Sequence, residues 1–436
     1  HIMPILKKQK VDKSVLDLAY ERLNSVFDHF DTVSVSFSGG KDSTVCLNLT
    51  LEVARQRNRL PLDVVTWDEE AIPYQTEEYC RRVSKMPDVN FRWYCVPVVH
   101  LNACSRQEPY WYPWAKEVKD KWVRPMPPEA ITEVDNYNGH IIGGRLSIPF
   151  MAPLLYPVEK YGRTACIMGI RADESLTRYR AVSQKTVENY IIHPKEEISL
   201  SEAVKGGVDI SRFPTRKLSK SGKQKMLSNN VGNFYKVYPI YDWQTADVWT
   251  APQKFGWDYN KAYDVMEKVG MTHSAQRCAP PFGSEPLEGL WTFKECFPEI
   301  WDKMCYRVRG ANTAARHALT VLYSNRKQPQ KPDGMEWEEY IAYWIRKFPL
   351  KLQGSMSLRI QTLIKKHYDK TKDPILTKTP HPISGISWEF LLKIAIRGDF
   401  KARKLEPFFS KSNVKEWESR KSMYARELAD VQQSTN

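Results

Sequence analysis

The spacing of apolar side chains changes along the chain. Between residues 14 and 30 they recur every three or four positions, as on a helix with one buried face. Val33–Phe37 alternates at every second position, as a strand does, and Ser38-Gly39-Gly40 interrupts it. Residues 43–57 return to helical spacing. The pattern predicts a helix, a strand, a glycine turn and a second helix.

The same alternation continues after this opening. Leu62–Trp67 is a second predicted strand, residues 75–85 a helix, and Phe91–Val96 a third strand. A further buried strand is predicted at Cys166–Ile170. Strands that alternate with helices favour an α/β fold, with a Rossmann-like parallel sheet.

Two stretches interrupt this pattern. Residues 100–160 are rich in Trp, Tyr and Pro, which predicts an aromatic insertion. Residues 205–225 hold seven basic side chains against one acid, which predicts a mobile basic loop. We divide the chain into an α/β domain, residues 1–255, and a mainly helical C-terminal domain, residues 256–436. The helices predicted in the second domain are 263–269, 336–347, 388–396 and 414–428.

Composition narrows the class of protein. The 436 residues include 65 Lys and Arg against 51 Asp and Glu, a formal net charge of +14 that favours a polyanionic partner. The net charge does not show whether that partner is a nucleic acid or a nucleotide. The eight cysteines contain no Cys-x-x-Cys pair, so we expect reduced thiols and a cytoplasmic protein. No apolar run reaches the roughly 18 residues of a membrane-spanning helix, and no membrane partner is expected.

The strongest candidate for chemistry is the loop Ser38-Gly39-Gly40-Lys41-Asp42-Ser43-Thr44. Glycines let the backbone turn sharply and bring its N–H groups against an anion. The following helix directs its positive end at the same point, and Lys41 adds charge. Asp42 fits such a site as a Mg²⁺ ligand or as a helix cap. The spacing is not that of a Walker A loop, because Asp42 follows the lysine.

This loop resembles the pyrophosphatase (PP) loop of the adenine-nucleotide α-hydrolase superfamily. Two further segments resemble motifs of the phosphoadenosine phosphosulfate (PAPS) reductase family: Trp67-Asp68-Glu69-Glu70, like its acidic strand end, and Gly169-Ile170-Arg171-Ala172-Asp173-Glu174-Ser175, like its phosphate-facing segment. The block at 238–249 resembles the motif that follows. Segments at 111–114, 122–126, 169–175, 278–283 and 307–312 resemble the IbrA-type branch, whose members carry a C-terminal extension and typically have a ParB/sulfiredoxin-like partner.

The resemblance implies chemistry at the α-phosphate of ATP, with PAPS as the other candidate nucleotide. Lys41 and Arg171 are expected to stabilise phosphate charge, Asp42 to hold Mg²⁺, and Asp173 or Glu174 to orient Arg171 or bind the metal. A surface ion pair between Arg171 and either acid is the alternative. The expected catalytic residues are Lys41, Asp42, Arg171 and Glu174. The expected nucleotide-binding residues are Ser36, Phe37, Ser38, Gly39, Gly40, Lys41, Asp42, Ser43, Thr44, Trp67, Asp68, Glu70, Gly169, Arg171 and Asp173.

The chain departs from assimilatory PAPS reductases in its cysteines. Their C-terminal catalytic cysteine has no counterpart, because no cysteine follows Cys305. The paired cysteines of an iron–sulfur cluster are missing as well, so no cluster is expected. Cys278, beside Arg277, is either a low-pKa thiol or, as we favour, a small buried residue.

These patterns predict a PP-loop enzyme that acts as an ATP pyrophosphatase, an adenylating enzyme or a sulfur-transfer enzyme. The basic loop and the aromatic insertion favour DNA or RNA as a partner, although such segments more often are solvated or pack internally. One alternative is a PAPS reductase that uses Cys278 or a partner's thiol. Another is a nucleotide-sensing regulatory subunit without chemistry. The acceptor, any sulfur donor and the oligomeric state are not readable from the sequence.

Overall fold

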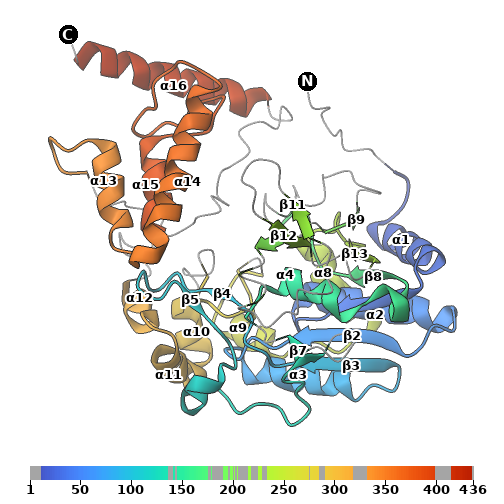
Figure 1. Ribbon diagram of the computed structural model, residues 1–436. Helices are drawn as coiled ribbons and strands as arrows, with labels where there is room; N and C mark the ends of the chain where they lie inside the picture. The colour runs from blue at the N-terminus through green and yellow to red at the C-terminus, as the bar shows by residue number, and fades with distance from the viewer. Residues whose placement is uncertain are drawn as a thin grey trace.

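A six-stranded sheet forms the centre of the protein, in the order β3-β2-β1-β8-β13-β9 (Figure 1). Five strands run parallel, and β9 pairs antiparallel with β13. The six strands are β1 (Thr32–Ser36), β2 (Leu62–Trp67), β3 (Val89–Tyr94), β8 (Arg163–Ile167), β9 (Ile191–Ile192) and β13 (Asn233–Val237). The computed structural model describes residues 11–135, 141–142, 145–174, 178, 190–194, 197–199, 201, 204, 215–217, 224–227, 233–273, 275–283, 290–317, 331–397 and 414–434.

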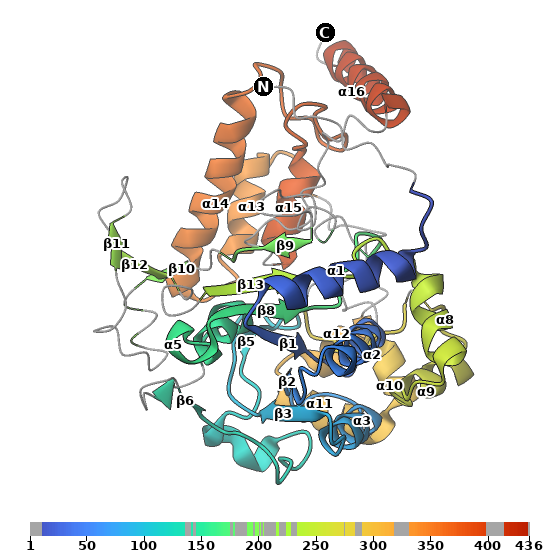
Figure 2. The ribbon, with the colours of Figure 1, turned by 90° about the vertical axis from the view of Figure 1, so that its right-hand side faces the viewer.

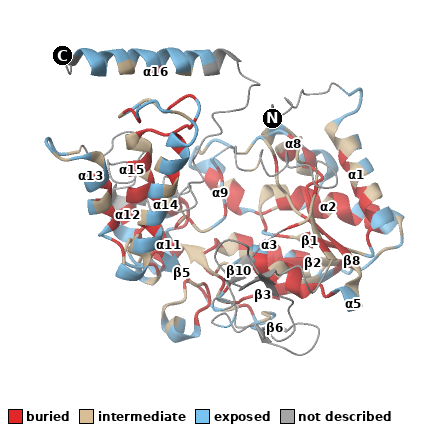
Figure 3. Cartoon of the chain, turned by 45° about the horizontal axis from the view of Figure 1, so that its top comes forward, coloured by how far each residue is buried: buried red, intermediate tan, exposed pale blue. Residues whose placement is uncertain are grey.

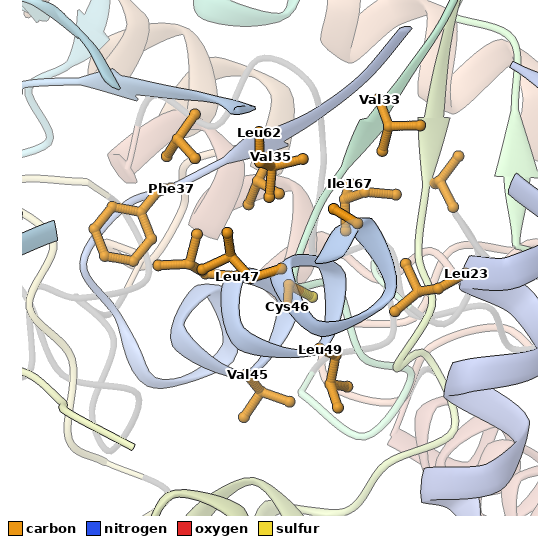
Figure 4. Packing of buried hydrophobic residues seen from close by; sticks show 14 of the residues in the cluster. Leu23, Val33, Val35, Phe37, Val45, Cys46, Leu47, Leu49, Leu62 and Ile167 are labelled. Atoms are coloured by element: carbon orange, nitrogen blue, oxygen red, sulfur yellow. The ribbon is translucent and has the colours of Figure 1, made fainter. Parts of the chain in front are cut away.

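Helices cover both faces of this sheet (Figure 2). On one face lie α1 (Val15–His29), α2 (Lys41–Gln56) and α3 (Tyr74–Ser84), whose apolar side chains share a core with β1 and β2. Figure 4 shows Val35 and Leu62 of the sheet beside Leu47 of α2. The opposite face packs against short helices: α4 (Ile148–Met151), η2 (Ala152–Leu155) and α5 (Val158–Tyr161).

Smaller elements flank the sheet. Among the described residues there are three small sheets: β4 (His100–Leu101) pairs with β5 (Tyr110–Trp111), β6 (Val134–Asp135) pairs with β7 (Ile141–Ile142), and β12 (Gln224–Leu227) pairs with both β10 (Glu197–Ser199) and β11 (Thr215–Lys217). The other helices are η1 (Lys116–Lys121), α8 (Thr245–Phe255), α9 (Ala262–Lys268), α10 (Leu290–Cys296), α11 (Pro298–Arg307), α12 (Ala311–His317), α13 (Trp337–Ile345), α14 (Leu350–Tyr368), α15 (Trp388–Arg397) and α16 (Val414–Ser434).

The helical part contains two separate cores. The first joins α9–α12 to Ala71, Trp111 and Val123 of the α/β part, so it crosses the boundary predicted at residue 256. The second is formed by α13, α14 and α15. The helix α16 is exposed over most of its described length (Figure 3) and is anchored by Tyr424, whose hydroxyl donates to the Pro374 carbonyl at 2.6 Å.

The α/β fold with a parallel sheet and a helical C-terminal region is confirmed. The strand predicted at 166–170 begins earlier and ends at Ile167. The prediction of a loop over 205–225 is wrong for Thr215–Lys217, which forms β11, because backbone pairing with β12 does not depend on the charge of its side chains. The rest of that stretch, apart from Gln224 and Lys225 in β12, lies outside the described residues. Within the described residues, no helix is long and apolar enough to cross a membrane.

Two tryptophans of the aromatic insertion are packed rather than exposed to solvent. Trp111 and Trp114 are 5% and 1% exposed and lie in two of the cores. Trp114 also contacts Trp122 edge to face, at 5.1 Å between ring centroids. The expectation that this segment helps to form a nucleic-acid surface is therefore wrong for these two tryptophans, since burial of a large apolar area stabilises the packed arrangement.

Candidate functional site

The loop 38–44 connects the carboxyl end of β1 to the first turn of α2. Gly39 has a φ of +74°, a conformation that side chains with a Cβ rarely adopt, and this turn starts the helix at Lys41. Within the loop, the Ser38 hydroxyl lies 3.2 Å from the Ser43 hydroxyl and accepts from the Gly40 amide at 3.3 Å. The serines therefore hold the loop in shape.

Several backbone amides of this loop point to no protein acceptor. In the described part of the chain, the N–H groups of Gly39, Asp42 and Ser43 have no hydrogen-bond partner. Two of these amides belong to the first turn of α2, where the helix dipole adds positive potential. Open amides at a helix start form a site for a phosphate group.

The Lys41 side chain and amide are both held by the segment that follows α8. Its ammonium donates to the Gln276 carbonyl at 3.1 Å, and its amide donates to the Tyr263 hydroxyl at 2.9 Å. Asn260 donates to the Gly39 carbonyl at 2.9 Å. Burial lowers the pKa of Lys41, because the charged form is less well solvated there than in water.

Arg171 lies against the same helix start. It is 1% exposed, and its Nε donates to Asp42 Oδ1 at 2.5 Å. The neighbouring Gly169 packs on the Asp42 backbone so closely that a Cβ would lie 2.7 Å from the carbonyl carbon. The structure therefore brings together the loop and the segment at 169–171, which are far apart in sequence.

The two acids after Arg171 lie on different sides of it. Glu174 Oε2 accepts from the Arg171 amide at 3.4 Å and pairs with Arg178. Asp173 is exposed, and its Oδ2 lies 3.7 Å from Arg171 Nη1. Ser175 lies outside the described residues. The guanidinium of Arg171 is therefore buried against Asp42, which argues against a surface ion pair as its main role.

Asp68 and Glu70 have partners inside the protein. Asp68 accepts from the indole of Trp93 at 2.9 Å and pairs with the buried Arg124. Glu70 is fully buried and pairs with Arg307 at 2.9 Å. Both carboxylates thus bind the insertion and α11 to the end of β2, and they present little surface to a ligand.

Other residues expected to bind nucleotide have mixed environments. Phe37 and Thr44 are buried, the first against Tyr79 at 5.4 Å between ring centroids. Ser36 ends β1 and is half-buried. Trp67 is half-buried and stacks on Tyr94, with 5.0 Å between centroids. Trp67 therefore offers a ring near the carboxyl edge of the sheet, whereas Phe37 offers only backbone.

Sequence reasoning missed Glu69 and His100. Burial, with a smaller contribution from Asp68, raises the pKa of Glu69 to about 7, and burial lowers the pKa of His100 to about 4. Glu69 Oε1 lies 3.5 Å from His100 Nε2, a buried atom without a hydrogen bond in the described residues. No local pattern could have found Glu69, because β2 ends at Trp67 and strand alternation does not extend to it. A carboxyl with a pKa of about 7 exchanges its proton near neutral pH.

Cys278 is a buried, protonated thiol. It is 7% exposed and accepts from Asn260 at 3.5 Å. Burial raises its pKa to about 11, so little thiolate is present at neutral pH. This environment matches the small structural residue that the sequence favoured.

The chain was compared with known families and proteins. The phosphoadenosine phosphosulfate reductase domain matches residues 32–277, and a domain of unknown function (DUF3440) matches residues 270–379. The uncharacterized protein YbdN of Escherichia coli (strain K12) is 28% identical over 414 residues, which cover 93% of each chain.

Two solved structures are also similar. FMN adenylyltransferase from Candida glabrata matches with 13% identity and a TM-score of 0.29, over 59% of this chain and 63% of that one, so less than two thirds of that protein is spanned. PAPS reductase from Candida auris, in a phosphate complex, matches with 12% identity and a TM-score of 0.25, over 59% of this chain and 93% of that one. The family match over residues 32–277 includes the loop 38–44, β2 and the segment 169–171, and it spans more than half of the chain. The chain therefore belongs to the phosphoadenosine phosphosulfate reductase domain family, as its motifs indicated.

Proposed function

We propose that this protein binds ATP at the loop 38–44 and supports cleavage between its α- and β-phosphates. The observation that carries the proposal is the set of amides at Gly39, Asp42 and Ser43 that have no acceptor among the described residues, at the start of a 16-residue helix. These groups suit the pyrophosphate end of a nucleotide. Lys41, Arg171 and the helix start supply positive charge for it.

The reaction follows from where charge develops. A nucleophile forms a bond to the α-phosphorus, the bond from that phosphorus to the bridging oxygen breaks, and pyrophosphate leaves with the electron pair. Lys41 and the loop amides stabilise the leaving oxygens, and Asp42 fixes the guanidinium of Arg171 at the same place. The nucleophile belongs to an acceptor molecule that is adenylated or that receives sulfur in a later step.

Magnesium fits this arrangement through Asp42. Mg²⁺ usually takes one or two carboxylates together with phosphate oxygens and water, and Asp42 supplies one carboxylate whose Oδ1 is bound to Arg171. Asp42 would therefore hold the ion with one oxygen, and the nucleotide would supply the others. The bound ion neutralises charge on the phosphates.

The second candidate function is that of a PAPS reductase, and the state of the Cys278 thiol argues against it. Reduction of a sulfonucleotide needs a thiolate, whereas the pKa of Cys278 is raised to about 11 by burial. A reductase would therefore need a thiol from a partner such as the ParB/sulfiredoxin-like protein. A nucleotide sensor would bind at the same loop without turnover.

Calorimetric titration with Mg²⁺-ATP and with PAPS separates these functions. We expect tighter binding of ATP, and at least tenfold weaker binding by the Lys41→Ala variant. Lys85→Ala, which changes an exposed lysine at the end of α3, is the matched control. Preference for PAPS would favour the reductase, and equal binding by Lys41→Ala and the wild type would contradict the site. Release of AMP and pyrophosphate from labelled ATP then distinguishes an enzyme from a sensor.

A further inference from the structure

The helix α14 and the residues that flank it are strongly basic. Between residues 346 and 372 the chain has eight basic side chains and one acidic one: Arg346, Lys347, Lys351, Arg359, Lys365, Lys366, Lys370 and Lys372 against Asp369. Asp369 pairs with Lys365 at 2.9 Å. Within the described residues, Lys351 and Lys366 have no carboxylate at ion-pair distance.

The stability of the helix accounts for Lys366, which lies in the last turn at the negative end of the helix dipole, but not for Lys351. One side of α14 is buried through Met356, Ile360 and Leu363 in the core shared with α13 and α15, so packing holds the helix in place. Lys351 lies in the first turn, at the positive end of the helix dipole, where a cation is unfavourable. A fixed positive charge at this position is useful when an anion approaches from outside.

Apolar and aromatic groups are also exposed elsewhere around α14. Leu350 and Leu358 are 84% and 64% exposed, and Tyr368 at the end of the helix is 51% exposed. Between the leucines, Gly354 is a glycine in a helix interior, which costs about 1 kcal/mol relative to alanine. A Cβ at Gly354 would meet nothing within 4 Å, so no crowding inside the protein requires the glycine there. It does allow another molecule to approach the helix backbone closely.

We propose that the exposed surface of α14 binds single-stranded nucleic acid. Lysines along a helix about 28 Å long match a run of phosphates, and the exposed tyrosine offers a face on which a base can stack. This surface lies outside the two segments, the basic loop and the aromatic insertion, that the sequence suggested for nucleic acid. In Figures 1 and 2, α13, α14 and α15 stand as a group beside the α/β part. The proposal does not depend on ATP binding.

The test is fluorescence anisotropy of the full chain with labelled single-stranded DNA and RNA of about 20 nucleotides, without ATP, from about 50 to 200 mM salt. We expect affinity to fall steeply with salt. The double variant Lys351→Glu/Lys366→Glu should bind at least tenfold more weakly, with a log–log salt slope shallower by about 1.4. The control is Lys85→Glu/Lys160→Glu, which makes the same charge change at exposed positions of the α/β part.

A second variant separates stacking from charge. Tyr368→Ala should lower the affinity at least fivefold and leave the salt slope unchanged, because a ring binds a base without releasing counterions. Circular dichroism checks that each variant is folded. Three results would overturn the proposal: no binding at the lowest salt, an equal loss in the control variant, or tighter binding of a duplex of the same sequence.

Discussion

The guanidinium of Arg307 donates two hydrogen bonds to the carboxylate of Glu70, at 2.9 and 3.2 Å. Glu70 also accepts from the amides of Trp114 and Val123, at 2.7 and 3.0 Å. Arg307 ends α11, whereas Glu70 follows β2. One buried charge pair therefore connects the helical segment, the aromatic insertion and the edge of the sheet at which the loop 38–44 lies.

Loss of the Arg307–Glu70 pair should destabilise the folded protein. Arg307→Ala leaves the Glu70 carboxylate buried without its counter-charge, and we expect the free energy of unfolding to fall by about 3–5 kcal/mol. Urea unfolding measures this change in the free energy of unfolding. Arg309→Ala is the control, since Arg309 and Glu108 form an exposed pair that contributes less than about 1 kcal/mol. Equal losses in the two variants would show that Glu70 is satisfied without Arg307.

The planar guanidinium geometry of Arg171 should matter more for ATP binding than its positive charge alone. Arg171→Lys keeps the positive charge but loses the planar donor set that reaches Asp42, so we expect ATP to bind at least tenfold more weakly. Arg82→Lys, in an exposed pair with Asp258, should leave ATP binding within about twofold of the wild type. Calorimetry compares the two. Full affinity in Arg171→Lys would remove Arg171 from the phosphate site.

The Tyr263 hydroxyl is hydrogen-bonded to a backbone amide that a bound phosphate would use. Its hydroxyl accepts from the Lys41 N–H, so a nucleotide must displace it. Tyr263→Phe frees the amide, and we expect ATP affinity to rise several-fold. Tyr259→Phe is the control, because the Tyr259 hydroxyl bonds to Asp264 instead. Weaker ATP binding by Tyr263→Phe would instead make this hydroxyl part of the nucleotide site.

The Glu69 carboxyl should make stability depend on pH. Its pKa is about 7 in the folded protein against an ordinary value of 4.5, so the folded state holds the proton more tightly than the unfolded state does. Stability therefore falls as pH rises from 4.5 to 7, and the loss is complete above 7. Glu69→Gln removes this loss.

Urea unfolding at pH 5 and pH 8 tests the Glu69 prediction. The gain from Glu69→Gln should be small at pH 5 and on the order of 3 kcal/mol at pH 8. Glu78→Gln, at an exposed position of α3, should show no such difference. An equal gain at both pH values would place the Glu69 carboxyl in an environment as polar as water.

The sequence predicted the sheet and the glycine turn before α2 because both depend on local patterns. Strand alternation and a glycine turn are visible in a few residues, and β1, α2 and β2 lie within one or two residues of their predicted bounds. The roles of Asp68 and Glu70 were harder to predict. Arg124, the partner of Asp68, lies 56 residues away, and Arg307, the partner of Glu70, lies 237 residues away. No local sequence pattern predicts such distant pairs.

The helix α14 was missed for another reason. Its apolar positions follow helical spacing on one side, but Gly354 and the exposed Leu350 and Leu358 blur that pattern. Glu69 was passed over between two acids that seemed better candidates. In each case the deciding information is which side of an element is buried, and only the tertiary fold supplies it.

The hydrophobic core that contains residues from both sides of position 256 limits where the chain can be cut into folded fragments. A fragment that stops at residue 277, the end of the reductase-domain match, would lack α10–α12 and expose Ala71, Trp111 and Val123. Such a fragment would aggregate, since a large apolar patch reaches water. A fragment that ends at 317, after α12, keeps that core intact. The smallest unit that folds independently is thus longer than the family domain by one helical layer.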